Sequence, residues 1–96
     1  MDYTKLSDTT EMIKLLLKRK NERYGDSFYK SLDKYGDPAF YIRLEDKINR
    51  MENLFKDGSD LVNESDESLL DTITDIAGYC ILYLTYKKEG GDGRCS

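Results

Sequence analysis

Apolar residues recur every three or four positions along most of the chain, which is the spacing of one face of an α-helix. The pattern covers residues 6–24, 39–56 and 66–88. No segment alternates apolar and polar residues with the period of two that a half-buried β-strand shows. The pattern therefore predicts an all-α fold, a small helical bundle of three long helices with a short helix after the first.

The first long helix is predicted over residues 6–24. Asp8 is a suitable N-cap, and Glu11 three residues later completes a start that resembles a capping box. Gly25 is expected to end the helix, because glycine readily adopts the left-handed backbone found at helix ends. The apolar face of this helix consists of Met12, Ile13, Leu15, Leu16 and Leu17.

A short helix is predicted around Phe28 and Leu32, which are four residues apart, with Gly36 at its end. Asp37 and Pro38 then indicate the start of the second long helix, because aspartate caps a helix and proline fits its first position. We predict that this helix covers residues 39–56. Its apolar stripe consists of Tyr41, Leu44, Ile48, Met51 and Phe55.

The third long helix is predicted over residues 66–88, after a polar, turn-rich loop. Ser65 is its expected N-cap. Its apolar stripe is expected to consist of Leu69, Ile73, Ile76, Cys80, Ile81 and Leu84. Tyr79, Tyr83 and Tyr86 lie beside that stripe, and we expect them to cover a partner helix.

The length of 96 residues favours a single domain. We predict it over residues 1–88, with residues 89–96 as a flexible tail. Three helices of this length form a thin bundle with little core, so we expect a homodimer to complete it. No apolar run is long enough to span a membrane, and the first residues lack the pattern of a signal peptide.

The net charge of −4 comes from 15 basic and 19 acidic residues, which argues against a general nucleic-acid binder. A small phosphorylated ligand remains compatible with it. The two cysteines, Cys80 and Cys95, do not have the spacing of a disulfide framework or a zinc site, and the chain has no histidine. We therefore expect a reduced protein of the cytoplasm.

Two of the long helices carry oxygen ligands beside their apolar stripes. If these helices pack together, their acidic edges converge on one groove, which would suit Mg²⁺ or Mn²⁺. The candidate metal ligands are Glu45, Asp46 and Asn49 on the second helix and Glu67, Asp71 and Asp75 on the third. The alternative is that these acids form a solvated helix face, as charge runs usually do. The apolar or small neighbours of Asp71 and Asp75 leave that helix little polar surface, so both interpretations stay open.

Basic residues form a second candidate site. Lys20 lies near the end of the first helix, and Tyr24 one turn later offers a ring for a base or sugar. Arg43, Lys47 and Arg50 lie along one side of the second helix and are candidate phosphate ligands. The alternatives are ordinary C-terminal capping for the first helix and surface ion pairs for the second.

Three segments in this order, KRKNERYGDSF, YIRLEDKINRMENLF and ESLLDTITDIAGYCILYL, resemble the family called nucleotide modification associated domain 1. The resemblance covers about residues 12–86. Members of this family look like compact relatives of the MazG-type all-α nucleotide pyrophosphohydrolases. The resemblance implies a MazG-like fold and a cytoplasmic, often phage-encoded protein that binds or acts on nucleotides. It also implies Mg²⁺ as a cofactor and a dimeric or larger assembly.

The sequence departs from the MazG-type metal motif, in which an E-x-x-E pair on one helix faces an E-x-x-D pair on the next. Here the second helix has Asp46 and Asn49, and Thr72 stands three residues before Asp75, with Asp71 as the nearest substitute. The acids are thus present in number but not at that spacing, which argues against hydrolysis and still allows a nucleotide site that uses a metal. The first prediction is a nucleotide-binding protein that resembles Mg²⁺-dependent nucleoside triphosphate pyrophosphohydrolases, with turnover left open. The second is a phage interaction protein without turnover, which binds a host protein or a signalling nucleotide.

Overall fold

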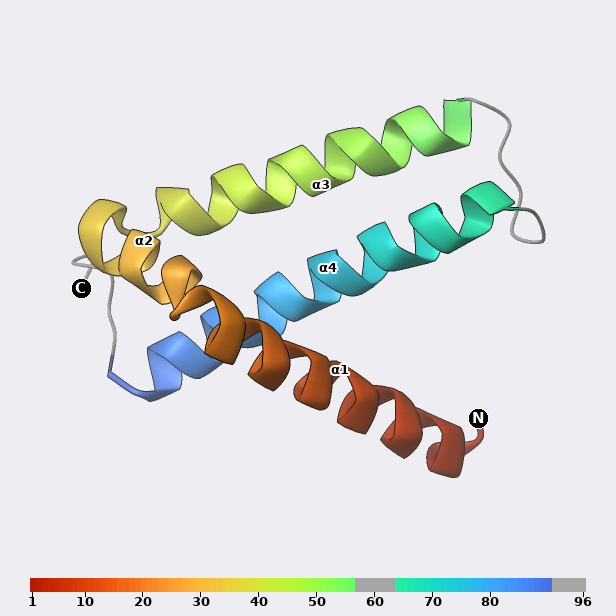
Figure 1. Cartoon of the computed structure of the whole chain (residues 1–96), viewed down its shortest axis with the longest axis horizontal. Coiled ribbons are helices and arrows are strands. Elements are labelled where there is room, and N and C mark those ends of the chain that lie inside the picture. Colours follow the sequence, from red (N-terminus) through yellow and green to blue (C-terminus); the bar gives the residue numbers. More distant parts are fainter. Residues whose placement is uncertain (57–63, 91–96) are drawn as a thin grey trace.

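The structure is a computed structural model that describes residues 1–56 and 64–90, with side chains for 1–56 and 69–90. It contains the helices α1 (Tyr3–Tyr24), α2 (Ser27–Tyr35), α3 (Pro38–Lys56) and α4 (Glu64–Lys88), shown in Figure 1. No strand occurs in these residues. The predicted all-α fold, with three long helices and a short one, is therefore confirmed, while the homodimer stays a prediction.

Helix α1 begins earlier than Asp8, at Tyr3, so the predicted start was wrong. The Asp2 carboxylate accepts hydrogen bonds from the backbone N–H groups of Thr4 at 2.9 Å and Lys5 at 3.2 Å, which makes Asp2 the N-cap. Residues 3–7 contain no glycine or proline to stop a helix, so α1 continues back to this earlier capping side chain. The predicted end at Gly25 is confirmed, with φ at 65°.

The turns before and after α2 lie at the residues that the sequence predicted for them. Gly25 and Asp26 both have left-handed backbone, which reverses the chain between α1 and α2. Gly36 ends α2, and Pro38 is the first residue of α3. The Asp37 carboxylate forms an ion pair with Lys87 at 3.1 Å, which joins the start of α3 to the end of α4.

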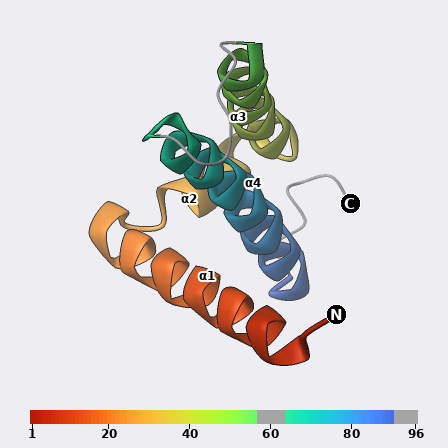
Figure 2. The ribbon, with the colours of Figure 1, turned by 90° about the vertical axis from the view of Figure 1, so that its right-hand side faces the viewer.

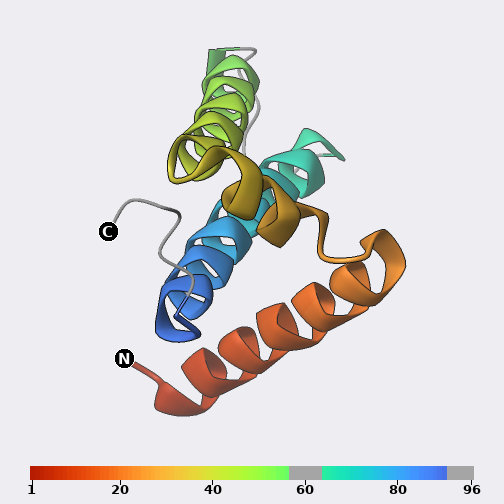
Figure 3. The same ribbon diagram turned by 90° about the vertical axis from the view of Figure 1, so that its left-hand side faces the viewer.

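Helices α3 and α4 run antiparallel, and α4 lies between α3 and α1 in both side views (Figures 2 and 3). The rings of Phe40 and Tyr83 stack at 4.3 Å between centroids and so join α3 to α4. On the other side, the Leu17 side chain of α1 packs against Gly78 of α4. Helix α2 packs against α3 and closes the end of the bundle.

The tyrosines of α4 form the core of the chain together with α2 and α3. Tyr86 is buried in a cluster with Phe28, Leu32 and Ala39, and Tyr79 and Tyr83 pack against this cluster. The Tyr86 hydroxyl donates a 2.7 Å hydrogen bond to the carboxylate of Asp33. The expectation that these tyrosines cover neighbouring helices is confirmed within a single chain.

The aliphatic stripe predicted to be the core face of α4 is partly on the surface. Leu69 is buried, but Ile73, Ile81 and Leu84 are exposed. The tyrosine face is buried instead, because aromatic rings bury more area and their hydroxyls find hydrogen-bond partners inside. Other residues of the predicted apolar faces are also exposed: Met12, Leu15, Tyr41, Ile48 and Phe55.

Some predictions lie outside the described residues. These are the loop at 57–63, the tail at 91–96 with Cys95, and the side chains of Ser65 and Glu67. The backbone of residues 64–68 is helical, so α4 starts at Glu64 rather than at residue 66. Among the described helices, none is long and apolar enough to cross a membrane.

Candidate functional site

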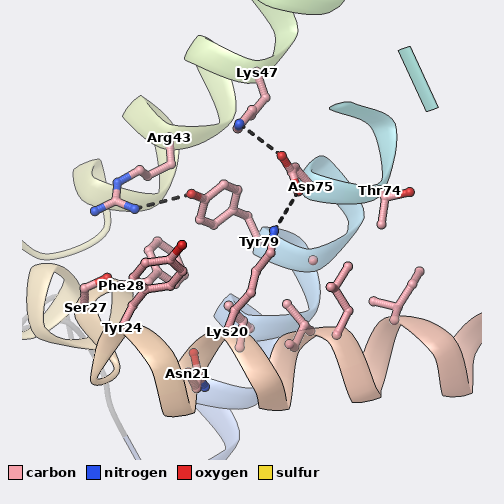
Figure 4. A pocket seen from close by; sticks show the side chains of 15 residues that line it. Lys20, Asn21, Tyr24, Ser27, Phe28, Arg43, Lys47, Thr74, Asp75 and Tyr79 are labelled. Carbon is pink, nitrogen blue, oxygen red and sulfur yellow. Dashed lines mark hydrogen bonds and ion pairs between the residues drawn. The ribbon is translucent and has the colours of Figure 1, made fainter. Parts of the chain in front are cut away.

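A pocket of about 220 Å³ lies between α1, the start of α2, α3 and α4 (Figure 4). Its floor is apolar, and its polar side chains come from all four helices. The polar lining residues are Lys20, Asn21, Tyr24, Ser27, Arg43, Lys47, Thr74, Asp75 and Tyr79. The other lining residues are Ile13, Leu16, Leu17, Phe28, Gly78 and Leu82.

Asp75 lies at the centre of the charged side of this pocket. The Lys20 ammonium is 3.2 Å from its Oδ1 atom, and the Lys47 ammonium is 3.0 Å from its Oδ2 atom (Figure 4). Burial raises the pKa of Asp75. The hydrogen bonds from Lys47 and Lys20 and the charges of these lysines lower the pKa by more than burial raises it, so the pKa lies below its ordinary value. Asp75 is therefore a carboxylate that joins α1, α3 and α4 through two ion pairs.

Arg43 is held on the opposite wall of the pocket by aromatic and hydroxyl groups. Its Nη1 atom donates to the Tyr79 hydroxyl and its Nη2 atom to the Ser31 hydroxyl, both at 3.4 Å. Its guanidinium carbon lies 5.7 Å from the ring centroid of Phe28 and 5.9 Å from that of Tyr79. Such cation–π contacts position the guanidinium and leave its charge uncompensated. No ion pair to a carboxylate is found for Arg43 among the described residues.

Three pairs of side chains, each four residues apart, build the polar part of the pocket. They are Lys20 and Tyr24 on α1, Arg43 and Lys47 on α3, and Asp75 and Tyr79 on α4. Residues four apart share a helix face. Each of these three helices therefore presents at least two polar groups to the same space.

Gly78 sets how closely α1 approaches α4. A Cβ atom at this position would lie 3.0 Å from Cδ2 of Leu17, so a larger residue would push against α1. Leu17 stands three residues before Lys20 on α1, and Gly78 stands three residues after Asp75 on α4. The close packing at Gly78 therefore brings the Lys20 side chain within reach of Asp75.

Four predicted nucleotide-binding residues, Lys20, Tyr24, Arg43 and Lys47, line the pocket. The fifth, Arg50, is exposed and does not line it. One helical turn beyond Lys47, α3 has passed the end of the pocket. The structure thus brings Lys20 together with Arg43 and Lys47, which both lie more than 20 positions away in the sequence.

The predicted metal ligands do not come together within the described residues. Glu45, Asp46, Asn49 and Asp71 are exposed and do not line the pocket. Only Asp75 of that set lies in it, and both of its oxygens already contact lysines. Across the described part of the chain, no three acidic, cysteine or histidine side chains group together as a metal site.

Sequence reasoning did not assign several residues that complete the pocket. Asn21 and Ser27 add neutral polar groups, and Tyr79 adds both a ring and the hydroxyl that accepts from Arg43. Tyr79 lies one turn after Asp75 on α4, and this spacing could have indicated that both side chains line the same pocket. Its partner on α3 was not visible in the sequence, because the pairing depends on how α3 and α4 align.

The fold and the pocket define this chain as a small all-α protein with a cationic pocket lined by aromatic rings. Comparisons with protein-family models, with curated proteins and with solved structures found no match. The resemblance to the nucleotide modification associated domain 1 family therefore stays a prediction.

Proposed function

We propose that the pocket binds a small phosphorylated ligand of the nucleotide type. The observation that carries this proposal is the convergence of Lys20, Arg43 and Lys47 on one space that holds a single described carboxylate, Asp75. Three positive charges and one negative charge give the lining a net charge of +2, in a chain whose net charge is −4. An uncompensated positive charge in an acidic protein favours an anion.

The size of the pocket limits which part of a nucleotide it holds. Its volume of about 220 Å³ is below the roughly 300–1,000 Å³ of sites that enclose a drug-sized ligand. Phosphate groups would therefore lie inside, against the two lysines and Arg43. The exposed Tyr24 lies at the lining of the pocket, where its ring is available to stack on a base or a sugar.

Asp75 acts in this proposal as an internal counter-ion. It keeps Lys20 and Lys47 extended into the pocket while no ligand is bound. A phosphate carries more negative charge and more acceptor oxygens than the Asp75 carboxylate, so the ligand competes for the same two ammonium groups and takes over contacts that already exist. The side chains are thus arranged before binding, which reduces the entropy lost when the ligand binds.

The proposal is limited to binding, without a hydrolytic step. Mg²⁺ in hydrolytic sites is usually held by one or two free carboxylates together with the phosphates of the substrate. In the described residues the pocket offers only Asp75, which is engaged by two lysines. The order of the three sequence motifs supports a nucleotide as the ligand.

The test is calorimetric titration of nucleoside triphosphates and of inorganic pyrophosphate, with EDTA present. Lys47→Gln should weaken binding by about tenfold or more, because it removes a charge-assisted hydrogen bond worth about 1.5–3 kcal/mol. Lys14→Gln is the matched control: it removes the same charge from the exposed side of α1 and should leave the affinity within about twofold.

Asp75→Asn separates the phosphate site from the predicted metal site. For a phosphate site the variant should bind at least as tightly as the wild type, because a competing carboxylate is removed. The titrations are then repeated with Mg²⁺ in place of EDTA, where for a metal site the variant should lose binding that depends on Mg²⁺, together with any release of pyrophosphate. If the wild-type chain binds none of these probes at millimolar concentration, the proposed function is wrong.

A further inference from the structure

The Arg43 side chain lies where three helices meet. It extends from α3, and its guanidinium contacts Ser31 of α2 and Tyr79 of α4 through their hydroxyl groups. The ring of Phe28, also on α2, lies beside it at cation–π distance (Figure 4). Arg43 is half-buried and lines the pocket. These contacts from two neighbouring helices restrict the rotamers of a side chain that is flexible when it is exposed.

Most of the hydrogen-bonding capacity of this guanidinium is left for a ligand. An arginine side chain carries five N–H donors. Ser31 and Tyr79 accept from two of its nitrogens at 3.4 Å, and no further hydrogen bond or ion pair of Arg43 is found among the described residues. Both acceptors are neutral hydroxyls, and both distances exceed the usual range of about 2.7–3.2 Å. The two contacts therefore orient the guanidinium and compensate little of its charge.

A half-buried positive charge of this kind is suited to an anion that comes from solution, because buried charges in proteins are normally paired. The two acids that follow Arg43 most closely in α3, Glu45 and Asp46, are exposed and form no ion pair with it. Asp75, the carboxylate of the pocket, contacts the two lysines instead. Within the described residues, Arg43 is thus the cation of the pocket whose charge no carboxylate balances.

We propose that Ser31 and Tyr79 are positioning residues, which hold Arg43 so that its remaining N–H groups bind two oxygens of one phosphate group. A planar guanidinium donates two parallel hydrogen bonds to such a pair of oxygens. Ser31 does not line the pocket, so it contacts the guanidinium from outside the space for the ligand. The inference rests on the proposed function: it assigns the group that recognises the phosphate of the same ligand and the two residues that orient this group.

The lysines of the pocket are suited to a different task. A lysine ammonium is a strongly hydrated point charge on a flexible chain, whereas the shape of a guanidinium selects a pair of oxygens at fixed spacing. Lys20 and Lys47 also contact Asp75, and a ligand has to compete for these contacts. Arg43 has no such contact to give up. It is therefore the cation that is already arranged for the ligand, so its orientation should affect the affinity.

The test is calorimetric titration of inorganic pyrophosphate and of nucleoside triphosphates, with EDTA present, into variants of this cluster. Arg43→Lys keeps the charge and removes the planar donor group, so it should weaken binding about tenfold or more. Tyr79→Phe and Ser31→Ala each remove one hydroxyl and keep every charge and ring. Each should weaken binding about threefold or more, because the guanidinium is then no longer held in one orientation.

A double-mutant cycle separates the orientation of Arg43 from a direct contact between hydroxyl and ligand. In the Arg43→Lys background the guanidinium is already absent, so Tyr79→Phe and Ser31→Ala should each change the affinity by less than about twofold. If they weaken binding by the same factor in both backgrounds, the hydroxyls do not act through Arg43 and the inference is wrong. Circular dichroism checks the helix content of each variant. Should Arg43→Lys lose its helix content, the two hydroxyl variants still decide the inference against the control below.

Tyr29→Phe is the matched control. Tyr29 is another half-buried tyrosine; it does not line the pocket, and its hydroxyl donates to a backbone carbonyl at 3.3 Å. The variant should leave the affinity within about twofold. A loss in Tyr29→Phe equal to that in Tyr79→Phe assigns the effect to packing and overturns the inference.

The failure of this inference differs from the failure of the proposed function. If the wild-type chain binds the probes and Tyr79→Phe and Ser31→Ala bind them equally well, the positioning role is wrong and the phosphate site stands. If the wild-type chain binds none of the probes, the proposed function is wrong and this inference falls with it.

Discussion

At the scale of single residues, the Asp75 carboxylate joins three of the four described helices through ion pairs. Its two oxygens bind Lys20 of α1 and Lys47 of α3 while its backbone belongs to α4. One carboxylate thereby joins three helices and also sets the charge of the pocket. Stability and ligand affinity are expected to respond to it in opposite directions, because the ion pairs that stabilise the fold compete with a bound anion.

Asp75→Asn should make the free energy of unfolding less dependent on acid pH. The pKa of Asp75 is lowered in the folded chain. Its ionised form therefore stabilises the fold above the ordinary carboxyl pKa of about 3.9, and this contribution is lost as the pH falls through the lower folded value. We expect the wild type to be more stable by on the order of 1 kcal/mol at pH 7, with the difference shrinking below about pH 4.

Urea unfolding of both proteins at pH 7, 5 and 3, at one protein concentration, measures this difference. Asp71→Asn on the same helix is the control, because Asp71 is exposed and should give a difference near zero at each pH. A difference between wild type and Asp75→Asn that stays constant down to pH 3 would contradict the role of the two ion pairs.

At the scale of the helices, the attachment of α1 depends on a close approach to α4. Leu17 packs over Gly78, and the Lys20 to Asp75 ion pair follows one turn along. The other long helices, α3 and α4, share a longer interface, with the stacked rings of Phe40 and Tyr83, one ion pair near its middle and another at the start of α3. Helix α1 is therefore the element whose position is most easily changed, and it carries Lys20 and Tyr24 of the pocket.

Gly78→Leu should displace α1 and weaken ligand binding. Overpacking costs about 1–3 kcal/mol, which exceeds the gain of about 1 kcal/mol in helix propensity relative to glycine. We expect a net loss of about 1 kcal/mol in the free energy of unfolding and faster amide exchange in α1. Adding Leu17→Ala makes room for the new side chain and should restore both; a double variant no better than Gly78→Leu alone would refute the packing argument.

At the scale of the whole molecule, the pocket and the exposed aliphatic residues of the α3 and α4 pair are separate features. The two helices hold their cations and aromatic rings toward α1 and α2, and their remaining aliphatic residues away from them. Variants of the pocket and variants of the exposed aliphatic residues therefore test separate properties of the molecule.

The melting temperature should rise with protein concentration, because association stabilises the folded chain by mass action. Between 5 and 500 μM we expect an increase of several degrees for the wild type in scanning calorimetry. Leu84→Glu should melt at a temperature that does not depend on concentration. Equal concentration dependence in both proteins would indicate that the exposed apolar side of α4 takes no part in the association.

The sequence by itself determined the helices and most of their ends. Gly25, Gly36 and Pro38 act through their own backbone preferences, so their effects are local and appear as predicted. The same holds for the pocket residues within each helix, because a spacing of four places Arg43 beside Lys47 whatever else the chain does.

Only the tertiary structure decided which face of α4 is buried and what Asp75 binds. A helix with tyrosines on one side and aliphatic residues on the other has two candidate core faces, and the choice depends on rings from α2 and α3 that lie far away in sequence. In the sequence, Asp75 is one member of an acidic stripe. In the structure, Lys20 of α1 and Lys47 of α3 each form an ion pair with one of its oxygens. Such pairings depend on how helices align in space, and no local pattern carries that information.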